Sequence, residues 1–469
     1  LDALCKTLLY HFLQFRMIIN KVRKRSKILI PFCAIFLHQK CTLNTNLKYK
    51  NSDDYFTIHS DSTENNLSAN EDVISSYHQN IIDPKIKSIQ ISSEKLKLVE
   101  PCYYLNSEQN INIDFDLIEA DPHPLQYEII HCDMNWDKSD LMVMEYLNGF
   151  DINYIDDVML SHGTQEQYVH YHFQLPNENI QFLKSGNYSL NIFHENENDD
   201  PLLRLRFYVS EESAKASLNV TRTSNIDQRN YMHAVELHCN YNYNTIDDPF
   251  QNLIINIQQN HQEFDELWFY EPNFVRDDKV TFLMNEDRVF NGGNEFRFFD
   301  MSNLITGGQN TSNVTLNENG YQVKLRPEIK RTYRQYFEYK DFNGKFVIQS
   351  HQSDLINTQA EYATVLFELP MKKINEDIYL FGQFTNWGVH DEFLMKYDSV
   401  SQKYYNKINL KQGYYNYIYI CKSGEKTDAR KMEGSHFDTN NEYIIKVYYR
   451  DPLGLYDRLL HYQVYDKNT

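Results

Sequence analysis

Short runs in which apolar and polar residues alternate dominate the chain from residue 84 onward. The first group of runs lies at 86–91, 111–117, 127–131, 168–173, 188–193 and 203–209. A period of two puts alternate side chains on opposite faces, so each run predicts a strand with one buried face. Pro or Gly interrupts the runs at 121–122, 185–187 and 200–201, as turn residues do. The pattern predicts an antiparallel β-sandwich over about 84–210.

A second group of runs follows, at 216–220, 235–239, 253–257, 267–270, 280–283, 295–299, 321–325 and 345–348. The polar stretch 350–354 then precedes another run at 362–369. We therefore predict a second β domain over 211–350 and a third over 351–469. Apolar residues with helical spacing never extend beyond two turns, which argues against a βαβ fold or a helical bundle. The predicted class is all-β, with tandem immunoglobulin- or fibronectin-like antiparallel sandwiches.

The first 83 residues have a different character. Five Lys or Arg residues between 21 and 27 precede an apolar run at 28–37, which is the order of a secretory signal peptide. We predict a leader over 1–41, with a signal peptide at about 17–40 that starts at Met17 and follows an upstream extension. An uncleaved anchor and a lipid-modified Cys41 are less favoured alternatives. Residues 42–83 lack an apolar period and predict a flexible polar lead-in.

Composition narrows the list of partners. The chain has 469 residues, a hydrophobic content of 41% and a formal charge of −19. The first 40 residues hold eight Lys or Arg against a single acid, so the exported part is more acidic than the total indicates. An acidic surface repels a phosphate backbone, and we expect no nucleic-acid partner.

The cysteines beyond the leader are sparse. Cys102, Cys132, Cys239 and Cys421 form no C-x-x-C pair, so single buried thiols are favoured over a disulfide framework. A bridge between Cys102 and Cys132 stays open as an alternative.

Candidate catalytic and ligand-binding motifs are weak. His131, Cys132 and Asp133 are adjacent, but strand neighbours point to opposite faces and do not converge on a substrate. The acidic run 195–200 lacks the spacing of a calcium loop, and the glycine turn 291–294 lacks the helix of a phosphate loop. The sequence also lacks H-E-x-x-H and G-x-S-x-G. We predict no catalytic residue, no metal site, no cofactor and no enzymatic activity.

Two segments of the third predicted domain resemble early-set immunoglobulin-like domains related to glycogen-binding modules. They are Ile-Tyr-Leu-Phe-Gly-Gln-Phe-Thr-Asn-Trp at 378–387 and the tyrosine-rich strand at 410–420. In that family the corresponding tryptophan can stack on sugar rings, which makes Trp387 a candidate sugar-stacking residue. The segment 421–429 has no second tryptophan, so a packing role for Trp387 is favoured over sugar binding.

Blocks along the whole chain resemble the plug proteins of the type 9 secretion system. They lie at 127–136, 145–150, 175–179, 184–188, 274–277, 290–300, 433–437 and 447–450. The resemblance implies a non-enzymatic periplasmic protein, associated with the outer membrane, that occludes the periplasmic mouth of the translocon barrel. It implies neither a cofactor nor a small-molecule substrate. A glycan-binding periplasmic or surface protein and a hydrolase with an unfamiliar site remain as alternatives.

Aromatic and polar residues at predicted turns are candidates for contact with the barrel, because such side chains are common at the centres of interfaces. The competing interpretation is that they form sandwich corners. The candidates are Trp136, Tyr146, Phe150, Asn291, Asn294 and Arg297.

Overall fold

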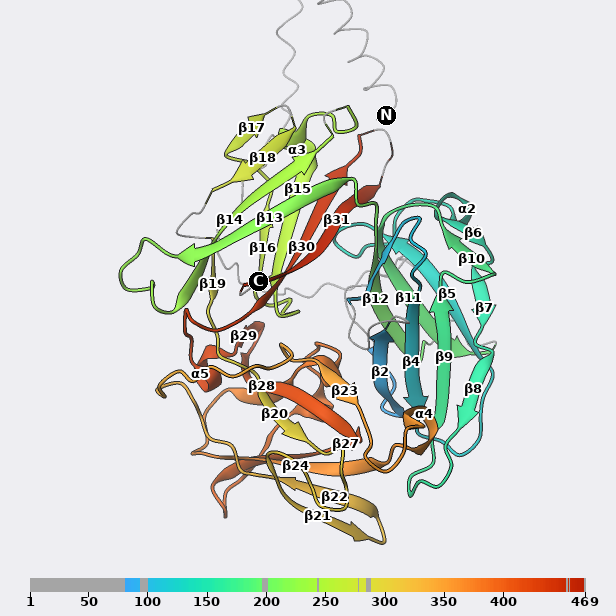
Figure 1. The fold of residues 1–469 in the computed structure, drawn as a ribbon, viewed down its shortest axis with the longest axis vertical. Coiled ribbons are helices and arrows are strands. Elements are labelled where there is room, and N and C mark those ends of the chain that lie inside the picture. The colour runs from blue at the N-terminus through green and yellow to red at the C-terminus, as the bar shows by residue number, and fades with distance from the viewer. Residues whose placement is uncertain are drawn as a thin grey trace, which may run out of the picture. The chain divides into compact units, whose positions relative to one another are not determined.

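The computed structural model describes residues 81–92, 100–195, 201–242, 244–276, 278–283, 288–452, 454 and 456–467. The predicted leader (1–41) and the lead-in (42–83), except its last three residues, lie outside them. Within the described part of the chain, no helix is both long and apolar enough to cross a membrane. The predicted all-β class of antiparallel sandwiches is confirmed (Figure 1).

The first sandwich pairs two antiparallel sheets around one apolar core. One sheet has the order β1 (Ile81–Ile82), β12 (Leu203–Ser210), β11 (Gly186–His194), β5 (Leu125–Cys132) and β7 (Ile152–Tyr154), with β3 (Cys102–Tyr104) parallel to β12. The other has the order β2 (Ile86–Ser92), β4 (Ile111–Leu117), β9 (Val169–Leu175) and β8 (Asp157–Leu160). Helix α2 (Val143–Tyr146) leads into a small sheet of β6 (Leu147–Gly149) and β10 (Ile180–Phe182).

The second sandwich also consists of two sheets. The first contains β13 (Ala214–Arg222), β14 (Met232–Tyr241), β18 (Lys279–Phe282) and β17 (Phe274–Arg276), with β19 (Val289–Asn291) on the same β14. The second contains β16 (Glu266–Phe269), β15 (Leu253–Gln259), β30 (Glu442–Arg450) and β31 (Asp457–Asp466), and α3 (Pro249–Asn252) precedes β15.

The third sandwich lies in the chain between β19 and β30. One sheet is built on β28 (Gly413–Ser423), which pairs with β20 (Arg297–Asp300), β23 (Phe346–Ile348), β25 (Asp377–Phe381) and β29 (Lys426–Asp428). The other has the order β21 (Thr311–Asn317), β22 (Gly320–Leu325), β24 (Tyr362–Pro370), β27 (Lys403–Lys411) and β26 (Lys396–Asp398). The short helices are η1 (Gln383–Thr385), η2 (Asp391–Phe393), α4 (Ile356–Gln359) and α5 (Arg430–Glu433).

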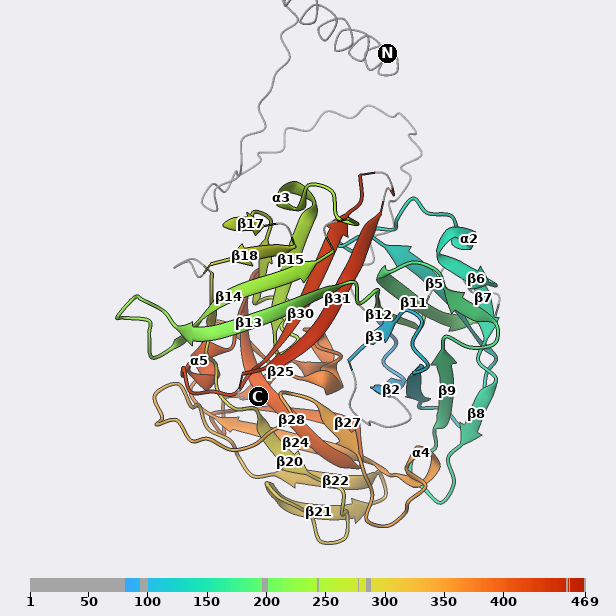
Figure 2. The same cartoon turned by 45° about the horizontal axis from the view of Figure 1, so that its top comes forward.

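This topology differs from the predicted division between the second and third domains. The C-terminal strand β30 pairs with β15, placing Tyr449 opposite Leu253 and Tyr443 opposite Gln259, and Figure 2 shows β30 and β31 beside β15. The last strands of the chain therefore complete the second sandwich, while β20 to β23 belong to the third. The boundary at 350 fails because alternation identifies a strand without identifying its neighbour in the sheet.

Candidate functional site

The chain crosses between the second and third sandwiches twice, and the two crossings are bonded to each other. The His436 amide donates to the Gly293 carbonyl at 2.9 Å, and Asn294 Nδ2 donates to the Glu433 carbonyl at 2.8 Å. Asn441 Nδ2 donates to the Gly292 carbonyl at 2.7 Å. A Cβ atom on Gly292 would lie 2.1 Å from the His436 carbonyl oxygen, so this close approach requires glycine.

A buried ion-pair network stabilises the start of the inserted sandwich. Arg297 Nε donates to Glu433 Oε1 at 3.0 Å, and its Nη1 donates to Glu328 Oε2 at 2.6 Å. Arg331 Nη2 lies 2.6 Å from the other Glu433 oxygen. Burial favours a raised pKa for Glu433, but the two guanidinium groups outweigh it and lower the pKa. This carboxylate is therefore ionised inside the protein.

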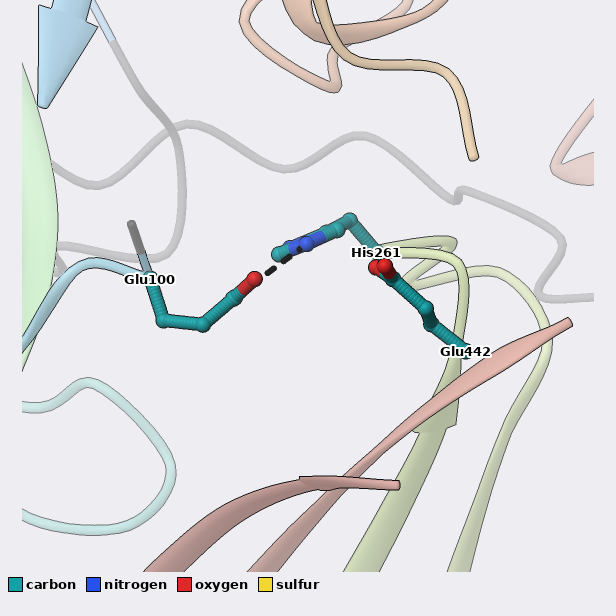
Figure 3. Close-up of side chains that lie close together, drawn as sticks. All are labelled: Glu100, His261 and Glu442. Atoms are coloured by element: carbon teal, nitrogen blue, oxygen red, sulfur yellow. Dashed lines mark ion pairs between the residues drawn. The ribbon is translucent and has the colours of Figure 1, made fainter. Parts of the chain in front are cut away.

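All three sandwiches contribute to a second network, which we call the Lys345 junction; Figure 3 shows three of its side chains, those of Glu100, His261 and Glu442. It comprises Glu100, which precedes β3, His261, which follows β15, Lys345, which precedes β23, and Glu442, which begins β30. Lys345 Nζ lies 2.8 Å from Glu100 Oε1 and 2.8 Å from Glu442 Oε2. His261 Nε2 lies 3.3 Å from Glu100 Oε2. One ammonium thus connects segments of all three sandwiches.

The charges of the Lys345 junction stabilise one another. Burial favours a raised pKa for Glu100, but His261 and Lys345 outweigh it and hold the pKa well below its usual range. Burial likewise favours a lowered pKa for Lys345, and the two carboxylates raise it instead. The side chains of Glu100, Lys345 and Glu442 are only 16%, 12% and 18% exposed. Separating the sandwiches here would leave poorly solvated charges without partners.

The Lys345 junction also offers two carboxylates and an imidazole as metal ligands. Ligand atoms of Glu100, His261 and Glu442 lie within 4.8 Å of one another. However, the Lys345 ammonium is at hydrogen-bond distance from both carboxylates, where it supplies the positive charge a metal would bring. With Lys345 in place, this donor set does not fit a metal ion, and its chemistry is that of a salt-bridge network.

A third network joins the first and third sandwiches at Asp116. Asp116 Oδ2 accepts hydrogen bonds from Lys411 Nζ at 2.7 Å and from the Tyr362 hydroxyl at 2.6 Å. The Lys411 ammonium also lies 4.2 Å from the centre of the Tyr168 ring, a favourable cation–π distance. Burial lowers the pKa of Lys411, with Asp116 acting in the opposite direction.

The motif that supplies Asp116 was missed in the sequence. Asp114 and Asp116 alternate on β4, and His170 and His172 alternate on β9. These D-x-D and H-x-H patterns, each on a predicted strand, were the available signal. Their significance depends on the register that places the two patterns opposite each other.

The proposed contact residues fall in two places and differ in exposure. Tyr146 and Arg297 are buried, at 3% and 2% exposure, which corrects their prediction as accessible contacts. Trp136 is half-buried, with the Arg206 guanidinium 4.8 Å from its ring centre. Phe150, in contrast, is 71% exposed. Asn291 and Asn294 are half-buried at the double crossing.

Trp387 packs at the Lys345 junction. Its ring stacks on the His261 imidazole, with centroids 4.5 Å apart and planes inclined by 15°, and it contacts Phe381 at 5.9 Å. His261 therefore covers one face that a sugar would need. The packing role agrees with this geometry better than the sugar-stacking alternative.

The adjacent His131, Cys132 and Asp133 form a hydrogen-bonded strand end. His131 Nδ1 lies 2.9 Å from Ser139 Oγ, and its Nε2 lies 3.1 Å from the Ser185 carbonyl. Burial lowers the pKa of His131 to about 4. The four cysteines beyond the leader are free and buried, as their spacing favoured. Most of the acidic run 195–200 lies outside the described residues.

The fold and its junctions define a class: a multidomain β-sandwich protein whose buried charges join domains. Residues 86–211 match the family model of the type 9 secretion system plug protein 1st domain. This segment is therefore a first domain of the plug protein family, as the sequence blocks indicated. A crystal structure of a hypothetical protein from Parabacteroides merdae is also similar, with 28% sequence identity and a TM-score of 0.80. The similarity covers 84% of this chain and 100% of that one. No curated protein matches the sequence significantly.

Proposed function

We propose that this protein is a non-enzymatic plug of the type 9 secretion translocon. It covers the periplasmic opening of the outer-membrane barrel through protein–protein contacts, after export by its N-terminal signal peptide. The observation that carries this proposal is the match of residues 86–211 to the first domain of the plug family. The periplasmic location, the outer-membrane association and the barrel as partner are parts of the same proposal.

The contacts between the sandwiches are suited to a protein that closes a pore, because they resist relative movement of the domains. A plug over a wide pore must resist relative movement of its domains under load, and close-packed cores deform little. In this protein the places most open to such movement are those where one sandwich meets another. The hydrogen bonds between the two chain crossings, the Lys345 junction and the Asp116 network lie at these places. Removing one partner of a buried ion pair costs about 3–5 kcal/mol, so moving one sandwich against another carries a large free-energy penalty.

The carboxylates at the junctions between the sandwiches are bound by cations, which suits a structural role for them. Glu100 and Glu442 share the Lys345 ammonium, and Glu433 is held by Arg297 and Arg331. A general acid or base must exchange its proton near neutral pH, whereas the neighbouring cations lower the pKa of Glu100 and of Glu433 and hold both carboxylates in the charged form.

Co-purification with the barrel tests the proposal. The tagged full chain, isolated from its native envelope, should retain the translocon barrel, and deletion of the chain should raise envelope permeability to large solutes. Unchanged permeability together with no retained barrel would refute the proposal.

Phe150 and Phe337 provide a matched pair for locating the contact, because they are 71% and 75% exposed in the first and third sandwiches. We expect Phe150→Ala to reduce barrel retention and Phe337→Ala to leave it unchanged. Equal retention by both variants would remove Phe150 from the contact surface.

A further inference from the structure

The connection between β22 and β23 is long and contains neither a helix nor a strand. Connections of more than about 12–15 residues without secondary structure are uncommon and often functional. We call its larger part, residues 326–342, the 326–342 loop. Four of its apolar side chains face solvent: Tyr333 is 95% exposed, Phe337 75%, Phe342 41% and Ile329 36%. The loop therefore displays aromatic rings that the third sandwich does not bury.

The 326–342 loop is held to the body of the protein at several points. The Tyr336 hydroxyl donates to the Glu295 carboxylate, and the Tyr339 hydroxyl donates to the Phe296 carbonyl at 2.8 Å. The exposed Phe337 lies between these two anchored tyrosines in the sequence. The backbone that carries the exposed rings is thus fixed in advance, which lowers the entropy cost of binding through them.

The exposed charges of the loop are mostly positive, in contrast to the chain as a whole. The loop holds five Lys or Arg against three Asp or Glu, in a chain of formal charge −19. Two of these acids offset the exposed cations little, because Glu328 is bound to Arg297 at 2.6 Å and Asp341 is half-buried. Arg334 and Lys340 are exposed, and among the described residues neither has a carboxylate as an ion-pair partner. The loop therefore attracts an anionic partner that the net charge of the chain repels.

The mixture of rings and cations fits a lipid surface better than a protein partner. The centre of a protein–protein contact is usually poor in charged residues. A peptide that adds a strand needs a sheet edge, and residues 326–345, all of them described, form no strand. At a bilayer surface, aromatic rings lie at the level of the headgroups, and Lys and Arg are attracted to anionic lipid. Screening limits electrostatic interactions to about 10 Å at 0.1 M salt, so acidic residues elsewhere on the protein do not prevent this contact.

We propose that the 326–342 loop binds the surface of a bilayer that contains anionic phospholipid. Tyr333 and Phe337 lie among the headgroups, and Arg334 and Lys340 bind the phosphates. This inference goes beyond the plug function, because it gives the protein a lipid partner in addition to the barrel. It assigns the loop of the third sandwich to lipid, whereas the barrel contact is assigned to Phe150 of the first.

Vesicle flotation tests the proposal. Protein isolated from its native envelope, and thus processed as in the cell, is mixed at about 0.1 M NaCl with vesicles of phosphatidylethanolamine and phosphatidylglycerol. A parallel sample contains vesicles of phosphatidylcholine alone. We expect binding to the anionic vesicles and none to the neutral ones. Equal binding to both, or no binding to the anionic vesicles, would overturn the proposal. Retention on immobilised polyglutamate without vesicle binding would identify an acidic polypeptide as the partner and would overturn it too.

Two pairs of variants locate the contact. Phe337→Ala should weaken vesicle binding about tenfold through lost apolar contact, whereas Val400→Ala, at a position 92% exposed in the same sandwich, should leave it unchanged. Arg334→Glu should weaken it roughly 30-fold, because one basic residue near an anionic surface contributes about fivefold and its reversal counts twice. Lys396→Glu, at an exposed position of β26, is the matched control.

All four substituted side chains are exposed, so we expect folded variants with melting midpoints like that of the wild type. Wild-type vesicle binding by folded Phe337→Ala or Arg334→Glu would overturn the proposal, and so would an equal loss in their controls. Barrel retention by Phe337→Ala should stay unchanged, so the lipid proposal and the plug proposal can fail independently.

Discussion

Replacement of the central lysine of the Lys345 junction is the sharpest test of how the sandwiches are joined. Lys345→Met retains the length and apolar stem of the side chain but removes the charge that contacts Glu100 and Glu442 at 2.8 Å each. Two carboxylates, less than one-fifth exposed, would then face each other without that cation. Loss of one partner from a buried ion pair costs about 3–5 kcal/mol. Partial exposure of these groups places our expectation near the lower end, at about 3 kcal/mol.

Urea unfolding followed by tryptophan fluorescence measures this loss, because Trp387 stacks on His261 within the junction. Lys396→Met, at an exposed position of β26, is the matched control and should change stability by less than about 0.5 kcal/mol. Adding Glu100→Gln to Lys345→Met removes one of the opposed charges and should restore part of the loss. Similar unfolding curves for wild type and Lys345→Met would refute the reasoning, as would a double variant less stable than the single one.

The same variant changes the response to acid. The folded pKa of Glu100 lies below its unfolded value, so its contribution to stability is present above about pH 4.3 and is lost as the pH falls. Without Lys345 the pKa should rise, and stability should decline less between pH 5 and pH 3 than in the wild type. A parallel decline in both proteins would contradict the assigned role of the lysine.

Three further predictions concern other buried groups. Gly292→Ala should lower the thermal unfolding midpoint more than Gly293→Ala, because a Cβ atom on residue 292 would collide with the His436 carbonyl. A Cβ atom on residue 293 would have no atom within 4 Å, and the only strain there would come from the positive φ of 66°. Equal shifts in the two variants would contradict the close approach at Gly292. Burial raises the pKa of Asp341 to about 7, so its ionisation opposes folding as the pH rises from 4 to 7, and melting at pH 5 and pH 8 should differ less in Asp341→Asn than in the wild type. Burial raises the pKa of the Cys132 thiol to about 12, so a thiol reagent should modify it only on unfolding, and rapid labelling of the native protein at this residue would disagree with the structure.

Alternation along the chain predicted many strands accurately because it is a local property. The predicted run at 111–117 has the same bounds as β4. The predicted run at 168–173 begins one residue before β9, and its other residues lie within that strand. Side chains that alternate every second residue must divide between a buried and an exposed face, whichever strand lies beside them. The all-β class followed from such runs without knowledge of any long-range contact.

The local sequence pattern did not predict which of the charged and aromatic candidates are buried. Arg297 was expected at an interface because arginine is common in binding hot spots, but it is buried against Glu433, which lies 136 residues later in the chain. Phe150, from the same set of candidates, is exposed. Both residues lie near turns, and only the packing of distant segments distinguishes them.

The sequence by itself determined the class of the protein, the positions of many strands and the resemblance of its blocks to a plug family. Tertiary structure alone decided that β30 completes the second sandwich, that Lys345 neutralises carboxylates from two other segments, and that D-x-D meets H-x-H in register. Alternation is set by each strand's own residues, whereas pairing and charge neutralisation depend on the summed free energy of segments far apart in the chain.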